Sequence, residues 1–229
     1  MPRFDAILFD AGGILVLPDP DVLGPLLAYY GGDPSVGAHR RAHYAAMAAK
    51  SRSGTGETVW DEYNGAYVRA LGVPDHDLEE AALVLGRTRN PHLWRWPVPD
   101  SVDALRSLAT IGVPMGVVSN ASGQIEETLR RSGVCQVGAG EGTEMRVVID
   151  SHVVGVAKPD PLIFEPALAH FAGIARERIA YVGDSVTMDI GGARAAGLHA
   201  VLLDPYDDHL DADFERIARL EDLLALVES

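Results

Sequence analysis

Each of three short apolar segments, far apart in the chain, stops abruptly at polar residues. The residues at these three ends are Asp10, the pair Ser119 and Asn120, and Asp184. Apolar runs of about four to eight residues bounded by turn signals are typical of buried parallel strands. Segments with helical periodicity follow them, and this alternation predicts an α/β fold with a doubly wound parallel sheet. Because right-handed crossovers bring the carboxyl ends of such strands to one edge, we expect these residues to converge there.

Two glycines, Gly12 and Gly13, follow Asp10 after a single alanine. Glycine lets the backbone turn sharply and lets a ligand approach the main chain closely. Taken alone, Asp10 fits a turn cap between a strand and a helix equally well. The recurrence of polar residues at three strand ends favours a binding site instead.

The chain between the first and second strands has a different character. Four segments there are predicted to be helical, and no strand is predicted between Val16 and Trp94; the four segments are residues 22–30, 34–50, 57–71 and 75–87. We therefore expect a core domain of residues 1–16 and 93–229 and an inserted helical bundle of residues 17–92. Within the core, a further helix is predicted over residues 162–171.

The charge balance excludes several classes of partner. The chain has nineteen Lys and Arg residues and thirty-three Asp and Glu residues, so the formal net charge is −14. The arginines are scattered, and we expect no nucleic-acid partner. The single cysteine, Cys135, excludes an intrachain disulfide or a cysteine metal cluster. The sequence shows no secretory signal and no apolar run of membrane-spanning length, so we expect a cytoplasmic, soluble protein with no membrane partner.

The residues at the strand ends suit phosphoryl transfer. Asp10 can act as a nucleophile or a metal ligand, and Asp184 and Asp189 add the hard oxygen ligands that Mg²⁺ favours. A divalent cation would also neutralise phosphate charge and let a carboxylate approach phosphorus. Ser119 can donate a hydrogen bond to a phosphoryl oxygen. Lys158, one of only two lysines in the chain, can hold a positive charge against nucleophile and phosphate.

Four motifs, in the same order and spacing, resemble those of the haloacid dehalogenase superfamily of hydrolases over nearly the whole chain. They read Phe9-Asp10-Ala11-Gly12-Gly13-Ile14-Leu15, Val117-Val118-Ser119-Asn120, Gly155-Val156-Ala157-Lys158-Pro159-Asp160-Pro161 and Tyr181-Val182-Gly183-Asp184-Ser185-Val186-Thr187-Met188-Asp189. One motif alone would be a weak signal, whereas four in order are specific. The helical insert directly after the first motif resembles the C1-type cap of subfamily IA.

The resemblance implies a Mg²⁺-dependent hydrolase with a Rossmann-like core, whose reaction passes through a covalent intermediate. Asp10 would attack phosphorus, and water would hydrolyse the aspartyl-phosphate that forms. Ser119 and Asn120 would hold the transferring group, and Lys158 would stabilise its charge. The implied metal ligands are Asp10, the carbonyl group of Gly12, Asp184 and Asp189. Asp189 would bind the metal directly or orient its waters.

One position departs from the family pattern. Family phosphatases usually carry a second aspartate two residues after the nucleophile, which protonates the leaving group and later activates water. Here that position is Gly12, and Ile14 replaces the usual threonine. General acid–base catalysis contributes roughly 10²–10⁴-fold. We therefore expect low activity, or activity restricted to good leaving groups, unless the cap or Asp19 supplies an acid.

Three functions remain open at this point. The first is a phosphatase that acts on a small phosphorylated metabolite. The second is chemistry at carbon, as in the family's dehalogenases or its phosphonoacetaldehyde-cleaving branch, which also lack the second aspartate. That branch uses a cap lysine as a Schiff base, and Lys50 is the only lysine of this cap, although a helix lysine is commonly a solvated charge. The third is a protein that binds a phosphorylated ligand or a partner without turnover.

Two further patterns lie in the predicted cap. His39 and His43 have a spacing that can hold zinc, but no third ligand follows, and we interpret them as a solvated or packed pair. Trp60, Tyr63 and Tyr67 could line the site, although their helical spacing is more typical of a bundle core. The sequence indicates neither the substrate nor the oligomeric state.

Overall fold

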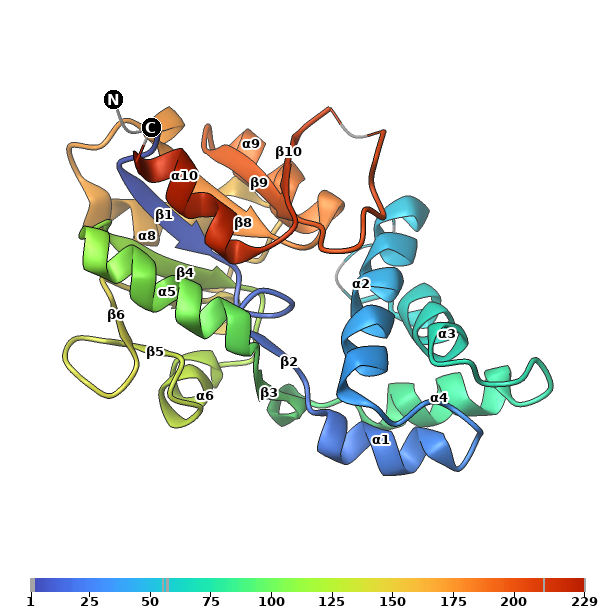
Figure 1. Ribbon diagram of the computed structural model, residues 1–229. Coiled ribbons are helices and arrows are strands. Elements are labelled where there is room, and N and C mark those ends of the chain that lie inside the picture. Colours follow the sequence, from blue (N-terminus) through green and yellow to red (C-terminus); the bar gives the residue numbers. More distant parts are fainter. Residues whose placement is uncertain (1–2, 55, 57, 212, 229) are drawn as a thin grey trace.

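The computed structural model describes residues 3–54, 56, 58–211 and 213–228. Its centre is a six-stranded sheet whose paired strands all run parallel (Figure 1). In spatial order the strands are β10 (Glu215–Ile217), β9 (His199–Leu203), β8 (Ile179–Gly183), β1 (Ala6–Phe9), β4 (Met115–Ser119) and β7 (Val148–Asp150). The predicted parallel α/β sheet is confirmed, with the first motif on its inner strand β1.

Both faces of the sheet are covered, which explains why β1 carries no polar residue. Ile7 and Phe9 belong to one apolar cluster, and Ala6 and Leu8 belong to another on the opposite face. The helices that contribute to the first cluster are α5 (Pro99–Ile111), α6 (Ile125–Arg131) and α10 (Leu223–Glu228). Those of the second are α8 (Glu165–Leu168) and α9 (Gly191–Ala195). Burial on two sides therefore holds the end of β1 in a fixed position.

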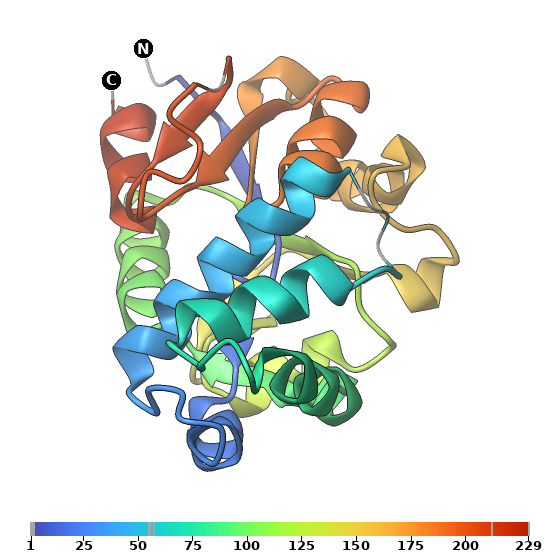
Figure 2. The same cartoon turned by 90° about the vertical axis from the view of Figure 1, so that its right-hand side faces the viewer.

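A bundle of helices is inserted between β2 and β3 and has an apolar cluster of its own. Its helices are α1 (Pro20–Ala28), α2 (Val36–Ser53), α3 (Asp61–Ala70) and α4 (Leu78–Thr88). The bundle lies to one side of the sheet in Figure 1, and Figure 2 looks onto it with the sheet behind. This is the inserted cap that the sequence predicted, and we propose residues 17–92 as its limits.

Two short strands connect the bundle to the core where the sequence predicted none. β2 (Val16–Pro18) pairs antiparallel with β3 (Trp94–Pro97). The prediction of no strand up to Trp94 is wrong here, because strands of three or four residues that contain proline are too short to show a period-two pattern. Trp94, the first residue of β3, lies beside Gly12 of the first motif.

Other elements also depart from simple helices and strands. The helix predicted over residues 162–171 is a 3₁₀ turn (Pro161–Phe164), the single turn α8, and a second 3₁₀ turn (Ala169–Phe171). The other described elements are a small parallel pair, β5 (Cys135–Val137) with β6 (Thr143–Met145), the short helix α7 (Ser151–Val154), a π-helical turn (Val186–Ile190) and 3₁₀ turns at Pro91–Leu93, Arg176–Arg178 and Leu220–Asp222. Across the described residues, no helix is both long and apolar enough to cross a bilayer.

Candidate active site

The predicted site residues meet in one cavity of about 390 Å³ at the carboxyl edge of the sheet. β1, β4 and β8 deliver the first, second and fourth motifs to this edge, and a loop after α7 delivers the third. The lining includes all seven candidates from the sequence: Asp10, Gly12, Ser119, Asn120, Lys158, Asp184 and Asp189. The convergence expected from parallel strands is therefore present in the fold.

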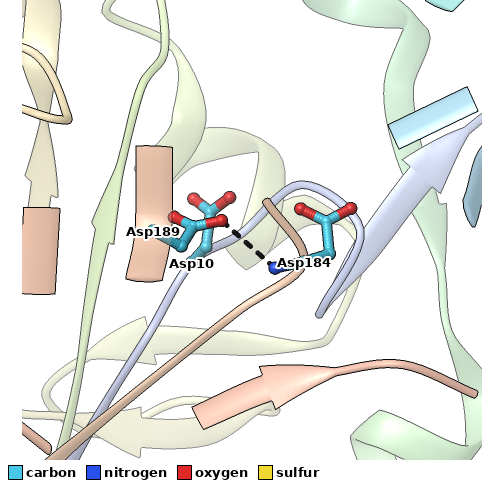
Figure 3. A group of neighbouring side chains, drawn as sticks. All are labelled: Asp10, Asp184 and Asp189. Atoms are coloured by element: carbon cyan, nitrogen blue, oxygen red, sulfur yellow. Dashed lines mark hydrogen bonds between the residues drawn. The ribbon is translucent and has the colours of Figure 1, made fainter. Parts of the chain in front are cut away.

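Three buried carboxylates form the acidic centre of this cavity. Asp10, Asp184 and Asp189 each place an oxygen within 4.8 Å of the others. Figure 3 shows the carboxylates of Asp10 and Asp189 next to each other, and its dashed line marks the hydrogen bond that the Asp184 backbone N–H donates to Asp189. Burial raises the pKa of Asp10 to about 7, and repulsion from the other two carboxylates adds to this effect. Burial also raises the pKa of Asp184.

The donor set fits a hard divalent cation. It consists of oxygen atoms alone, and Mg²⁺ prefers one or two carboxylates together with retained waters. Oδ1 of Asp10 is buried and accepts no hydrogen bond from a described residue, although Nζ of Lys158 lies 2.9 Å away in an ion pair. A cation at this point would offset the repulsion that raises the pKa of Asp10.

Lys158 is held between the candidate nucleophile and Asp189. Its Nζ lies 2.9 Å from Asp10 Oδ1, 2.6 Å from Asp189 Oδ1 and 2.7 Å from the Tyr181 hydroxyl. Burial opposes the charge of Lys158, but the two carboxylates outweigh it and raise the pKa above its usual value. Lys158 therefore stays charged beside Asp10.

Asn120 holds the loop that carries this lysine. Its Nδ2 donates to the carbonyl of Lys158 at 3.0 Å, and its Oδ1 accepts from the backbone N–H of Lys158 at 2.8 Å. The end of β4 is thus joined to the third motif by a reciprocal pair of hydrogen bonds. The amide of Asn120 is committed to the backbone of Lys158, whereas Ser119 lines the cavity next to it.

Both carboxylate oxygens of Asp189 already hold hydrogen bonds. Oδ1 accepts from Lys158 Nζ and lies 3.1 Å from the Tyr181 hydroxyl. Oδ2 accepts from the backbone N–H groups of Asp184 at 3.1 Å and Ser185 at 2.9 Å. Because these contacts use both oxygens, they disfavour direct metal binding by Asp189, and its other predicted role, orienting the waters of the metal, stays a prediction.

The place of the missing acid is bounded by Trp94. A Cβ atom added to Gly12 would lie 3.3 Å from the indole carbons Cε3 and Cζ3 of Trp94. Gly13 has a φ of 74°, and a Cβ there would collide with the carboxylate of Asp184. Gly13 is therefore required by the close approach of the second aspartate, whereas Gly12 is not required by the backbone.

His43 reaches this site from the cap, although no sequence pattern indicated it. Its Nε2 lies 2.8 Å from Asp184 Oδ2, and both side chains are buried. Its Nδ1 pairs with the Tyr63 hydroxyl at 2.9 Å, and His39 Nδ1 pairs with that of Tyr67 at 2.8 Å. The two histidines are a packed pair, as one interpretation had it, and each contacts its own tyrosine of α3. The contact with Asp184 joins sites 141 residues apart, and no local pattern indicates it.

Three other cap expectations have clear outcomes. Lys50 is only 3% exposed and lines the cavity, so its interpretation as a solvated charge is wrong. Trp60 lines the cavity too, whereas Tyr63 and Tyr67 are buried in the bundle core. Asp19 is not among the described cavity residues: it caps α1 and pairs with an arginine of β3 at 2.8 Å, so an acid from Asp19 is ruled out in this arrangement.

Comparison with known proteins gives a consistent group of relatives. A family model described as haloacid dehalogenase-like hydrolase matches residues 4–197. A phosphoserine phosphatase of Thermus thermophilus is 33% identical over 143 residues, which cover 62% of this chain and 53% of that protein. A glyceraldehyde 3-phosphate phosphatase of Methanopyrus kandleri is 30% identical over 169 residues, covering 70% of this chain and 69% of that protein. The chain spans about half the length of the first curated relatives it matches.

Solved structures share the fold over nearly the whole chain. A phosphatase from Thermococcus onnurineus superposes with a TM-score of 0.58 at 22% identity and covers 97% of both chains. An L-2-haloacid dehalogenase superposes with a TM-score of 0.57 at 20% identity and covers 99% of both chains. Phosphatases and dehalogenases therefore share this architecture, and the choice between them depends on the site.

Proposed function

The chain belongs to the haloacid dehalogenase-like hydrolases, and we propose that it is a Mg²⁺-dependent phosphatase of small phosphorylated metabolites. The observation that carries this proposal is the arrangement of Asp10. Its buried carboxylate lies 2.9 Å from the Lys158 ammonium group and within 4.8 Å of two further carboxylates. A nucleophile, a fixed positive charge and a hard-cation site in one cavity are what phosphoryl transfer requires.

In the proposed reaction, an Asp10 oxygen forms a bond to phosphorus while the ester P–O bond breaks and the leaving group departs with its electron pair. Water then attacks the aspartyl-phosphate, which releases inorganic phosphate and regenerates Asp10. Ser119 donates to a phosphoryl oxygen, and Lys158 stabilises the charge that develops. Asp10, the Gly12 carbonyl and Asp184 would hold Mg²⁺, which neutralises phosphate charge when bound. Asp189 keeps the lysine and the loop of Asp184 in place.

The absence of a side chain at Gly12 limits the leaving groups. No carboxyl group stands two residues after Asp10 to protonate a departing alkoxide, and Trp94 borders that space. Substrates whose leaving oxygen is a weak base need no such proton. We therefore propose that acyl phosphates and aryl phosphates are hydrolysed faster than alkyl phosphates.

The test measures phosphate release from p-nitrophenyl phosphate and acetyl phosphate, with Mg²⁺ and with EDTA. Asp10→Asn removes the nucleophile and should abolish turnover. Asp19→Asn is the matched control, since the same change lies outside the described cavity lining and should leave turnover intact. Wild-type turnover no higher than that of Asp10→Asn would refute the proposal in favour of a protein that binds without catalysis.

A second candidate is carbon–phosphorus cleavage in an aldehyde-bearing phosphonate. The observation in its favour is Lys50, which is buried and lines the same cavity. In this reaction the Lys50 amine condenses with the aldehyde to give an imine and water. The phosphoryl group then passes to Asp10 while the electron pair of the C–P bond is taken up by the imine as an enamine, and after protonation of the enamine, water releases acetaldehyde from Lys50 and inorganic phosphate from Asp10. Borohydride reduction in the presence of phosphonoacetaldehyde should then attach the substrate covalently to Lys50. Release of halide from 2-haloacids in the presence of EDTA tests the dehalogenase alternative separately.

A further inference from the structure

Both lysines of this acidic chain are buried in the same cavity. The chain has thirty-three acidic residues and only two lysines, Lys50 and Lys158. Their exposed fractions are 3% and 2%, and both line the cavity. Burial of an ammonium group costs free energy unless negative charge compensates it. Lys158 lies against Asp10 and Asp189 on the core wall, whereas Lys50 enters the cavity from helix α2 of the cap.

Lys50 meets a second cation over one aromatic ring. Its Nζ lies 3.5 Å from the centre of the Trp60 ring, and Cζ of Arg89 lies 4.3 Å from the same centre. Trp60 and Arg89 also line the cavity. An aromatic face stabilises neighbouring cations and keeps water away from them, which strengthens their attraction for an anion.

The two walls of the cavity carry opposite charges. Its described acidic residues, Asp10, Asp184 and Asp189, all come from the core. The charged residues of the described cap lining are Lys50 and Arg89, both cationic. A ligand that spans the cavity from the core to the cap therefore meets a metal and phosphate site at one end and two positive charges at the other.

We propose that Lys50, Arg89 and Trp60 form a second anion subsite, so that the substrate is a small phosphate monoester whose leaving group ends in a carboxylate or a second phosphate. This inference rests on the proposed phosphatase function. Arginine matches carboxylate and phosphate oxygens with two parallel N–H donors, and lysine adds a point charge. A cavity of about 390 Å³ admits a small metabolite. Binding of the second anion at this subsite also positions the phosphoryl group for attack by Asp10. Such positioning matters here because no general acid assists departure of the leaving group.

Binding of phosphonates, which cannot be hydrolysed at a P–O ester bond, tests this subsite without turnover. Calorimetry in Mg²⁺ compares propylphosphonate with 3-phosphonopropanoate and with propane-1,3-bisphosphonate. The matched chain lengths isolate the second anion, and the last two ligands distinguish a carboxylate from a phosphate. We expect 3-phosphonopropanoate, propane-1,3-bisphosphonate or both to bind roughly tenfold to a hundredfold more tightly than propylphosphonate.

Variants identify the residues responsible. Lys50→Met and Arg89→Met should each remove most of that preference, because they weaken binding of the two ligands with a second anion far more than binding of propylphosphonate. Arg87→Met is the control, because Arg87 lies near the end of helix α4, two residues before Arg89, is exposed, and is not part of the described lining. Lys50→Arg keeps the charge and should restore the preference, although it cannot form an imine. This last variant also separates the subsite from the Schiff-base alternative, and Arg89→Met remains informative if Lys50→Met does not fold.

Two outcomes would overturn the subsite. Equal binding of all three ligands to the wild type is one, and a preference that survives both Lys50→Met and Arg89→Met is the other. Hydrolysis of p-nitrophenyl phosphate together with equal phosphonate binding would remove the subsite and leave the phosphatase proposal standing. Tight, Lys50-dependent binding without any hydrolysis would instead remove the phosphatase proposal and retain the subsite.

Discussion

Restoring a carboxyl group at position 12 tests whether the missing acid limits catalysis. Gly12 does not have the positive φ that glycine alone tolerates well, so its backbone accepts a side chain. An added Cβ would lie 3.3 Å from two carbons of Trp94, a few tenths of an ångström inside the optimal carbon–carbon separation of about 3.5–4.0 Å. Gly12→Asp therefore requires only a small movement of the indole, whereas a side chain at Gly13 would collide with Asp184.

The expected gain depends on the leaving group. General acid catalysis is worth roughly 10²–10⁴-fold, and crowding by Trp94 favours the lower end of this range. We expect Gly12→Asp to raise kcat/KM for alkyl phosphates by about 10²-fold and for p-nitrophenyl phosphate by less than about threefold. The carboxylates of Asp10 and Asp184 would raise the pKa of the new carboxyl group, which suits a proton donor near neutral pH.

The assay measures kcat/KM for a series of aryl and alkyl phosphates at saturating Mg²⁺, plotted against leaving-group pKa. Gly12→Asp should flatten the slope of the wild type. Gly12→Asn has the same size and the same contact with Trp94 but donates no carboxylic proton, so it should keep the steep slope. Gly12→Asp combined with Trp94→Phe should extend the gain. A folded Gly12→Asp variant with the wild-type slope, or an equal gain from Gly12→Asn, would refute this explanation.

Three further results follow from single contacts. Tyr181→Phe loses a hydroxyl that donates to the Val118 carbonyl at 2.9 Å and lies next to Asp189, so urea unfolding should show a loss of about 1–3 kcal/mol. Asp19→Ala removes the cap of α1 and should cost about 1 kcal/mol with kcat unchanged; a fall in kcat would show that Asp19 acts in catalysis. In the metal-free protein the pKa of Asp10 is about 7, above its unfolded value, so this group's contribution to stability declines as pH rises from about 4 to about 7. Because Mg²⁺ requires the ionised carboxylate, calorimetry should find its affinity about tenfold weaker at pH 6 than at pH 8, and an affinity independent of pH would contradict this.

The core of the site could be predicted because its signals are local. Asp10, Ser119 and Asp184 each follow a short apolar run, and strands that alternate with helices bring such ends together in almost any parallel sheet. No distance information is needed for that conclusion. Lys158 was identified by its motif, and its contact with Asp10 at 2.9 Å agrees with the arrangement expected from the motif.

The cap's part of the site could not be predicted in the same way. Helix α2 is rich in alanine, so its helical period does not distinguish the face with Lys50 from a solvated face. The contact between His43 and Asp184 depends on how the bundle docks onto the core, and the position of Trp94 depends on a strand pair too short to detect. These are tertiary contacts, and they include the cap residue Lys50, which we propose sets specificity.

Helix α2 carries the cap residues that contact Asp184 and the first motif, and it also carries Lys50. His43 contacts the carboxylate of Asp184, and the Tyr44 hydroxyl donates to the Gly13 carbonyl at 2.6 Å. Lys50 follows His43 by seven residues, which is about two helical turns and about 10 Å along the axis, and it lines the cavity that Asp184 also lines. One rigid helix therefore joins the metal end of the cavity to its cationic end. Because the spacing of the two ends is fixed by the helix, the length of the substrate should be selected as strictly as its charge. In a series of ω-phosphonocarboxylates, affinity should rise to a single optimum in chain length, and Lys50→Met should abolish that optimum.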